Sequence, residues 1–154
     1  MTLRDVGGGD IDVFYKHQLD PAAIWMAAFT SRNPEGRDAF DSHWRKVLDD
    51  RSNTVKTILF NGGIAGHVAK YIDEGRPEVT YWIDRALWGK GIATDALLKF
   101  LAIVAVCPIF ARAARDNIAS LTVLKKCGFV ITGDGTGYAN GRRGEVEEFV
   151  LRLD

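Results

Sequence analysis

The sequence predicts an α+β fold in which about four helices flank a mixed, mostly antiparallel sheet of about seven strands. The hydrophobic pattern alternates between a two-residue and a 3.6-residue period, and the resulting order is β-α-α-β-β-β-α-β-α-β-β. The chain has 154 residues, no internal repeat and no long linker. We therefore expect one domain over residues 1–154.

The first three predicted elements are a strand and two helices. Ile11–His17 is rich in β-branched and aromatic residues, which favours a strand. Asp20 is a suitable N-cap, and the proline that follows it suits the first position of a short helix over Pro21–Phe29. Apolar residues then recur at helical spacing over Arg37–Asp49, which predicts an amphipathic helix packed on the sheet.

A hairpin and a third strand follow these helices. Thr54–Phe60 and Ile64–Ile72 are strand-like, and the Asn-Gly-Gly run between them is a strong hairpin turn signal. Pro77 introduces the next predicted strand, Val79–Ile83.

Helices and strands alternate in the second half of the chain. Pro108 ends a long helical pattern, and Gly128 follows two lysines that suit a helix C-terminus. The predicted elements are the helix Gly91–Cys107, the strand Ile109–Ala114, the helix Asn117–Lys126 and the strands Phe129–Thr132 and Glu145–Leu153.

Composition excludes several classes of protein. The 20 Lys and Arg residues equal the 20 Asp and Glu residues, so no basic excess favours nucleic acid or an anionic membrane as a partner. The most apolar stretch, Leu97–Cys107, is too short to span a bilayer, and Met1–Asp10 lacks the pattern of a signal peptide. Cys107 and Cys127 have no metal-ligand spacing, so we expect free thiols, no metal site and a cytoplasmic location.

The segment between the strand at 79–83 and the following helix carries the clearest chemical signal. Two glycines allow its backbone amides to point into one concavity, and the helix start adds the positive end of its dipole. Such a loop binds phosphate, although a tight connection that needs glycine for steric reasons alone remains an alternative. The residues are Trp88, Gly89, Lys90, Gly91, Ile92, Ala93 and Thr94.

A dinucleotide-binding fingerprint is a weaker interpretation of the same glycines. Asp116 lies at a suitable distance for the ribose-binding acid of that motif, but Thr94 replaces its third glycine. Too little chain follows Asp116 for the rest of a doubly wound sheet.

The loop resembles the acetyl-CoA loop of the GNAT superfamily of N-acetyltransferases, Arg/Gln-x-x-Gly-x-Gly/Ala. Gly91 and Ala93 fill its last two places, and Trp88 stands where Arg or Gln is usual. A second family motif is present as Asn117-x-x-Ser120 followed by Lys-Cys-Gly-Phe at 126–129. The chain is most similar to the branch that includes the ribosomal-protein N-terminal acetyltransferases.

This resemblance implies how acetyl-CoA, the expected co-substrate, is held. The pantetheine arm would lie where the strand ending at Ile83 splays away from the strand at 109–114, paired with the backbone of Trp82 and Ile83. The pyrophosphate would bind the amides of residues 89–93, close to Lys90. Asn117 would hold the arm or the adjacent turn. Lys125 or Lys126 would meet the 3′-phosphate, unless these lysines only compensate the helix dipole.

The resemblance also implies direct attack of an amine on the thioester. Backbone amides near Trp82 are the expected oxyanion donors. Leu124 occupies the position at which many relatives carry the tyrosine that protonates the thiolate, so Ser120 or a water is expected to act instead. Glu78 is the preferred candidate for the general base, and His67 and His17 are alternatives.

The expected acceptor is a primary amine on a small molecule or a peptide N-terminus. The resemblance implies that the region between the first two helices and the final hairpin selects the acceptor. Arg32, Asn33 and Arg37 are candidates for binding a carboxylate or phosphate on it, and Trp25, Trp44 and Tyr138 are candidates for the pocket wall. A homodimer is compatible with the prediction. Because Leu124 replaces the usual acid, the alternative is a catalytically silent acyl-CoA-binding module.

Overall fold

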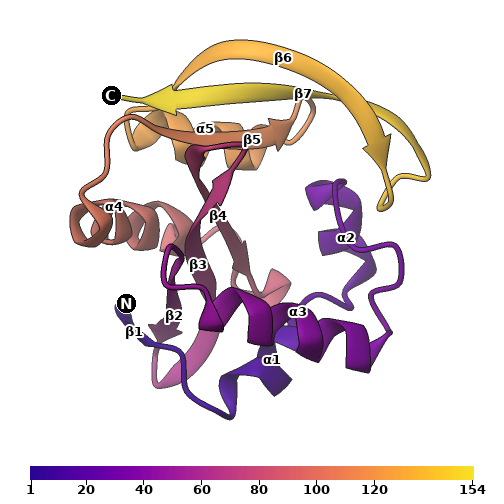
Figure 1. Ribbon diagram of the computed structural model, residues 1–154, viewed down its shortest axis with the longest axis vertical. Coiled ribbons are helices and arrows are strands. Elements are labelled where there is room, and N and C mark those ends of the chain that lie inside the picture. Colours follow the sequence, from indigo (N-terminus) through magenta and orange to yellow (C-terminus); the bar gives the residue numbers. More distant parts are fainter.

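The computed structural model describes residues 1–154 and contains one seven-stranded sheet in the order β1-β2-β3-β4-β5-β7-β6 (Figure 1). The strands are β1 (Thr2–Asp5), β2 (Thr54–Phe60), β3 (Gly63–Asp73), β4 (Arg76–Ile83), β5 (Ile109–Ala114), β6 (Val130–Ala139) and β7 (Gly144–Leu153). The helices are α1 (Asp10–His17), α2 (Pro21–Ala27), α3 (Arg37–Asp49), α4 (Ile92–Val104) and α5 (Ile118–Lys126), with a 3₁₀ turn at Arg85–Leu87. The predicted α+β class and the strand number are confirmed.

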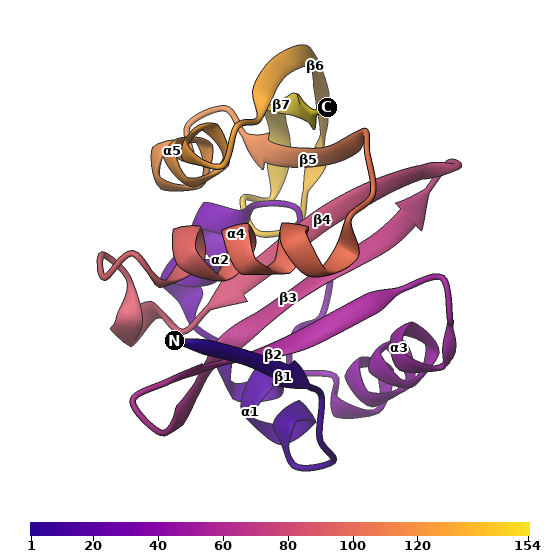
Figure 2. The same cartoon turned by 90° about the vertical axis from the view of Figure 1, so that its left-hand side faces the viewer.

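Helices cover both faces of the sheet. α4 lies across β1 to β4, and Figure 2 shows it in front of these strands. α5 packs beside α4 on β5. The main core lies between these two helices and the sheet and includes Ile58, Leu97, Phe100, Leu124 and Leu151, all of them buried. α1 contacts β3 on the opposite face, together with α3, and α2 contacts β5. We call this second face the α1 face.

β4 and β5 form the one parallel pair in the sheet, and they separate along most of their length. A single residue pair, Glu78 with Phe110, joins them, whereas eight pairs join β3 to β4. The edge of β4 from Val79 to Ile83 is consequently unpaired over about 16 Å. The splayed strand pair that the sequence led us to expect is present.

The N-terminal assignment was wrong. Ile11–His17 is helical rather than extended, because α1 places Phe14 against Trp44 and His67, with ring centroids 5.1 and 4.8 Å away. This tertiary packing outweighs the strand preference of its β-branched residues. The first strand is instead β1, a short edge strand whose largely exposed residues gave no apolar pattern.

Helix and strand ends differ from the prediction where the backbone turns left-handed or where glycines form a strand. α2 stops before Ala28 (φ +64°) and α4 before Ala105 (φ +51°), so both helices are shorter than predicted. β6 continues seven residues beyond the predicted end at Thr132, to Ala139, through three glycines that pair with β7. None of the helices combines the length and hydrophobicity that a membrane span requires.

Candidate active site

The loop between β4 and α4 has the backbone that its two glycines allow. Gly89 (φ +79°) and Gly91 (φ +77°) are both left-handed. A Cβ at either position would meet no atom within 4 Å. Glycine is therefore required by conformation rather than by crowding, and the space in front of the loop is open.

The start of α4 presents free amide groups to that space. Gly91 is the N-cap and offers no side chain to the first turn, so no cap bonds the amides of Ile92, Ala93 and Thr94. Unsatisfied amides at a helix start, together with the helix dipole, form an anion site. Lys90 is exposed beside them and has no carboxylate partner.

Trp88 fixes the loop to the end of β4. Its indole Nε1 donates a hydrogen bond of 3.0 Å to the carbonyl of Ile83, while 43% of the residue stays exposed. This places the tryptophan at the mouth of the β4/β5 cleft, where its ring face is accessible.

The backbone of β4 faces the cleft at alternate residues. Asp84 donates its amide to Ala65 of β3, and a Cβ on Gly66 would lie 1.9 Å from the carbonyl oxygen of Trp82, so Trp82 also faces β3. By alternation, the amides and carbonyls of Tyr81 and Ile83 point toward the cleft. The backbone of Ile83 is therefore oriented as expected for pairing with pantetheine, whereas the backbone of Trp82 is not. Tyr81 is the other residue whose backbone groups face this side.

Asn117 organises the far side of the cleft. Its Oδ1 accepts the amide of Ser120 at 3.2 Å and caps α5, while its Nδ2 donates to the carbonyl of Met26 at 3.1 Å. The other end of α2 is held by the ion pair between Asp20 and Arg85. α2 is thus attached to both segments that follow the splayed strands.

The C-terminus of α5 lies beside the first turn of α4. The thiol of Cys127 is 3.8 Å from the carbonyl oxygen of Thr94. Lys125 and Lys126 are exposed at this end of α5. Lys126 is thereby close to the uncapped start of α4.

Ser120 has a partner that the sequence did not reveal. Its hydroxyl lies 2.9 Å from the hydroxyl of Tyr81, whose side chain reaches from β4 to α5. Burial raises the pKa of Tyr81, so the phenol stays protonated at neutral pH. The alternation along β4 could have indicated that Tyr81 shares this side of the strand with the core residues Val79 and Ile83.

Glu78 lies on the α1 face, at the one position where β4 pairs with β5. The carboxylate is buried and accepts a hydrogen bond of 3.1 Å from Nε of Arg112, while its Oε2 has no partner. Burial raises the pKa of this carboxyl despite the opposing charge of Arg112. Asp73 and Glu148 approach the same guanidinium at 3.7 and 3.3 Å, so the cluster has an excess of negative charge.

The two histidines considered as bases have other surroundings. His67 is enclosed between Phe14 and Trp44, and burial lowers its pKa to about 3. Burial also lowers the pKa of His17, although its Nε2 lies 3.7 Å from Asp84. Both rings are therefore neutral at pH 7, and the packing of His67 makes it part of the core of the α1 face.

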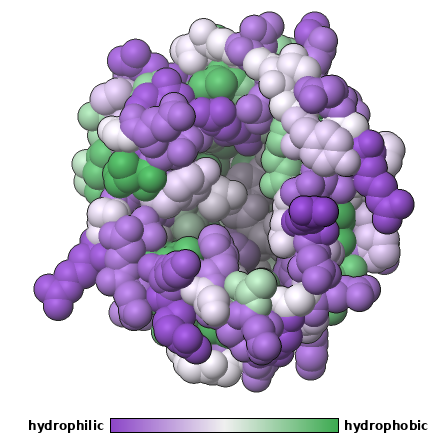
Figure 3. All heavy atoms as spheres, turned by 45° about the vertical axis from the view of Figure 1, so that its right-hand side comes forward, coloured by the Kyte–Doolittle hydropathy of each residue, from purple (hydrophilic) through white to green (hydrophobic).

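Unsatisfied polar atoms gather on the α1 face. Each of the five is buried without a hydrogen-bond partner, and each belongs to α1, β3, β4 or the segment after α2. Buried polar atoms without partners are rare and indicate a site for water or a polar ligand. Figure 3 shows the surface hollowed on this side of the molecule, with a largely hydrophilic rim. The atoms are His17 Nδ1, Thr30 Oγ1, His67 Nδ1, Glu78 Oε2 and Trp82 Nε1.

The remaining residues expected to select a substrate lie in different surroundings. Arg32 and Tyr138 line one cavity of about 480 Å³, whereas Arg37 is paired with Asp12 and Asp41. Trp44 is buried in the core of the α1 face, and Trp25 is covered on one side by Arg142 at 4.6 Å.

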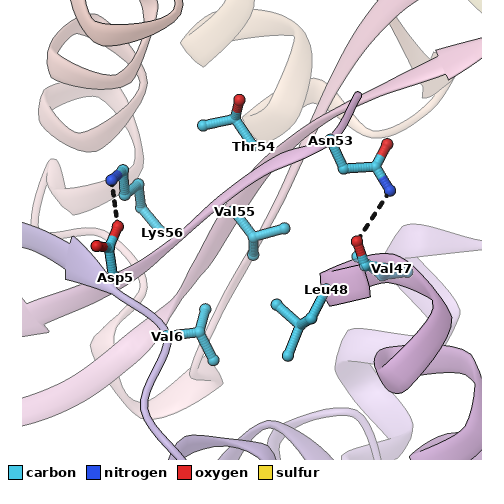
Figure 4. A pocket seen from close by; sticks show the side chains of 8 residues that line it. All are labelled: Asp5, Val6, Val47, Leu48, Asn53, Thr54, Val55 and Lys56. Carbon is cyan, nitrogen blue, oxygen red and sulfur yellow. Dashed lines mark hydrogen bonds and ion pairs between the residues drawn. The ribbon is translucent and has the colours of Figure 1, made fainter. Parts of the chain in front are cut away.

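A second cavity, of about 380 Å³, lies between α3 and the β1–β2 edge of the sheet (Figure 4). Val6, Val47, Leu48 and Val55 supply its apolar wall. Its polar groups are already engaged, since Lys56 pairs with Asp5 and Asn53 donates to the carbonyl of Val47. Nothing in this cavity is suited to chemistry.

Comparison with known proteins agrees with this geometry. The family model for the acetyltransferase (GNAT) domain matches residues 1–130. YdaF of Bacillus subtilis (strain 168), named provisionally as a ribosomal N-acetyltransferase, is 28% identical over 146 residues, covering 82% of this chain and 75% of YdaF.

Two solved structures share the fold. Spermidine N-acetyltransferase from Vibrio cholerae, in complex with CoA and spermine, has a TM-score of 0.79 at 20% identity over 98% of this chain and 94% of its own. RimJ from Mycobacterium smegmatis, in complex with CoA-disulfide, has a TM-score of 0.82 at 19% identity over 98% and 80%. The splayed strands, the uncapped helix start and the matching family model together show that this chain belongs to the GNAT family of acetyl-CoA-dependent N-acetyltransferases.

Proposed function

We propose that this enzyme transfers the acetyl group of acetyl-CoA directly to a primary amine held on the α1 face. The observation that carries the proposal is the open edge of β4, which ends at an uncapped helix start with two left-handed glycines. An anionic cofactor with an extended amide-containing arm matches both features. The arm adds to β4 as a strand would, and its phosphates bind the amides.

Each part of the loop then has a role in holding acetyl-CoA. The amides of residues 89–93 and the N-terminus of α4 bind the pyrophosphate, with Lys90 and Lys126 nearby. Tyr81 and Ile83 pair with the pantetheine through their backbones, and Trp88 holds the loop against β4. Asn117 contributes by fixing the turn before α5 rather than by direct contact, because its side-chain atoms are already bonded.

An acceptor that arrives as an ammonium ion must lose two protons from nitrogen, one before attack and one to water as the amide forms, while one proton must reach sulfur. The amine nitrogen attacks the thioester carbon, a C–N bond forms, and the oxyanion is stabilised by backbone amides of β4. Collapse of this intermediate breaks the C–S bond. Ser120, with Tyr81 behind it, supplies the proton that the CoA thiolate takes up.

Glu78 receives the proton that the ammonium ion of the acceptor loses before attack, directly or through a water. Its free Oε2, its burial and its raised pKa support this role. The need for it depends on the acceptor: an amine with a pKa of about 10.4 is under ~0.1% neutral at pH 7, whereas an α-amine near pKa ~8 is about 10% neutral.

The class of acceptor remains a small-molecule amine or a peptide N-terminus. The relatives named above point both ways, one being named for spermidine and another for ribosomal proteins. Two free cysteines support a cytoplasmic location, since thiols persist in reducing compartments. Exposed Val130 and Ile131 on the edge strand β6 support a homodimer.

Binding and turnover test the proposal separately. Isothermal calorimetry should detect acetyl-CoA binding, and the absence of binding at millimolar concentration would contradict it. A panel of α-amines, alkyl amines and peptides should then show release of free CoA. Tight binding without turnover on any amine would instead support the silent acyl-CoA-binding module that Leu124 suggests.

A further inference from the structure

The cavity of about 480 Å³ at the tip of the β6–β7 hairpin contains two arginines. Its lining is Arg32, Tyr138, Asn140 and Arg143. Arg32 comes from the segment between α2 and α3, and the other three belong to the hairpin. Figure 1 shows the hairpin tip lying next to α2, so segments about a hundred residues apart in the chain close around this space.

Neither guanidinium in the cavity is neutralised. Arg32 and Arg143 form no ion pair and no hydrogen bond, and no acidic residue lines the cavity. The adjacent Arg142, by contrast, is bound by both carboxylate oxygens of Asp116 at 2.7 and 2.9 Å. Two unpaired guanidiniums beside a phenol and an amide present donors suited to an oxyanion.

The frame around these arginines is fixed by hydrogen bonds. Asn140 donates from Nδ2 to the carbonyl of Thr30 at 2.7 Å, and the amide of Gly141 donates to Ala28 at 2.8 Å. A Cβ on Gly141 would lie 2.4 Å from the carbonyl oxygen of Ile24, so the hairpin packs directly on α2. The backbone that carries Arg143 is consequently held against α2 and against the segment that carries Arg32.

The hairpin also connects the cavity to the proposed general base. Tyr138 pairs with Glu145 of β7, and Glu148, three residues further along β7, contacts Arg112, which holds Glu78. Glu78 itself is aligned with Phe110 of β5, which pairs with Arg152 of β7, seven residues beyond Glu145 and hence about 23 Å along the sheet. An acceptor bound at both places therefore has to be long: about seven residues of extended peptide span this distance, and a small amine does not.

We propose that Arg32 and Arg143 bind a carboxylate or phosphate of the acceptor, and that the preferred acceptor is a peptide N-terminus with an acidic side chain near its seventh residue. This inference rests on the proposed acetyltransferase function. It assigns the cavity a role in choosing the acceptor and leaves the binding of acetyl-CoA to the β4–α4 loop.

Matched substrates test it. Peptides that differ in having Asp or Asn at position 6, 7 or 8 are compared by kcat/KM, together with a small amine that carries a phosphate and its uncharged analogue. The wild-type enzyme should prefer the acidic peptide by about 10-fold, as expected for a charge-assisted pair. The preference should decline with added salt. A preference confined to the small phosphorylated amine would overturn the choice of a peptide.

Variants of the two arginines test whether these side chains cause the preference for the acidic peptide. Arg32→Gln and Arg143→Gln should each reduce the preference for Asp over Asn, and the double variant should abolish it, with acetylation of the neutral peptide retained. Arg45→Gln, which alters an exposed arginine on α3 that is also unpaired, should change nothing. Equal rates for acidic and neutral peptides in the wild type would overturn the inference while leaving the acetyltransferase function intact. Weaker acetyl-CoA binding in the arginine variants would assign the cavity to the cofactor instead, and failure to acetylate any amine would contradict the proposed function itself.

Discussion

At the scale of single residues, we propose that the hydroxyl pair of Ser120 and Tyr81 acts in place of the tyrosine acid whose position Leu124 occupies. Leu124 is buried in the core and cannot donate a proton, whereas the two hydroxyls lie 2.9 Å apart. Ser120→Ala should lower kcat by about 10-fold, since a thiol with a pKa of about 8.5 leaves without full protonation. Stopped assays of CoA release would measure this.

Tyr81→Phe should lower kcat in the same direction and leave acetyl-CoA affinity unchanged, because only the hydroxyl is lost and the backbone stays. If the two hydroxyls act as one unit, the double variant should be no slower than the slower single variant. Additive losses would mean that they act separately. Thr122→Ala is the control, since its hydroxyl bonds the carbonyl of Ile118 on the outside of the same helix.

Glu78, as the proposed general base, should matter most for acceptor amines that are protonated at pH 7. Glu78→Gln should reduce kcat/KM far more for an alkyl amine than for an α-amine, because only the former is almost fully protonated at pH 7. Burial raises the pKa of Glu78, so the wild-type rate should rise with pH as this carboxyl ionises, and the variant should lack that rise. Glu148→Gln removes another carboxylate from Arg112 and serves as the control. An equal loss for both amines would argue against a base.

At the scale of elements, the loop before α4 can be tested by its backbone alone. Gly91→Ala forces a left-handed conformation on an L residue, which costs about 1 kcal/mol, and should weaken acetyl-CoA binding by about 10-fold as the loop relaxes. Gly75→Ala is a matched control: its φ is +79° and its Cβ position is equally open, but it lies in the β3–β4 turn. Calorimetry should find normal affinity in this control, and loss of affinity in both variants would indicate a general effect on the fold.

The elements also show how far sequence reasoning reached. The limits of α3, β2 and β5 were predicted to the residue, because periodicity and turn residues agreed there. α1 and β1 were not, since Phe14 becomes helical through contacts with Trp44 and His67 that are 30 and 53 residues away in the chain. Local pattern carries no information on such packing.

The candidate site likewise contains residues that the sequence indicated and residues that it did not. The loop at 88–94 could be proposed as the cofactor site from the sequence because its signal is contiguous and glycine-dependent. Tyr81, Arg112 and Arg143 were missed because their roles come from partners brought close by the fold, such as Ser120 for Tyr81 and Glu78 for Arg112. Strand register decides which backbone groups face the cleft, and the sequence does not specify register finely enough to separate Trp82 from Tyr81.

At the scale of the whole molecule, Asp10 joins the N-terminal strand to the rest of the fold. Its buried carboxylate accepts hydrogen bonds from both terminal nitrogens of Arg4, from the amide of Gly7 and from the hydroxyl of Thr57 in β2. The hydrogen bond from Arg4 is the main cause that lowers the pKa of Asp10 to about 2. One carboxylate thus holds β1, the start of α1 and β2 together.

The depressed pKa predicts how stability depends on pH. In the unfolded chain the carboxyl titrates near its ordinary value of 3.8, so the unfolded state binds more protons between about pH 2 and 4. The contribution of Asp10, about 2–3 kcal/mol, is present above pH 4 and disappears as the pH falls toward 2. Asp10→Asn should therefore lower the free energy of unfolding by that amount at pH 7 in urea titrations, and the difference from wild type should shrink at pH 2–3. Asp5→Asn is the control, because Asp5 is exposed and its pair with Lys56 is screened by solvent. A pH-independent difference for Asp10→Asn would show that shape rather than charge holds the N-terminal strand.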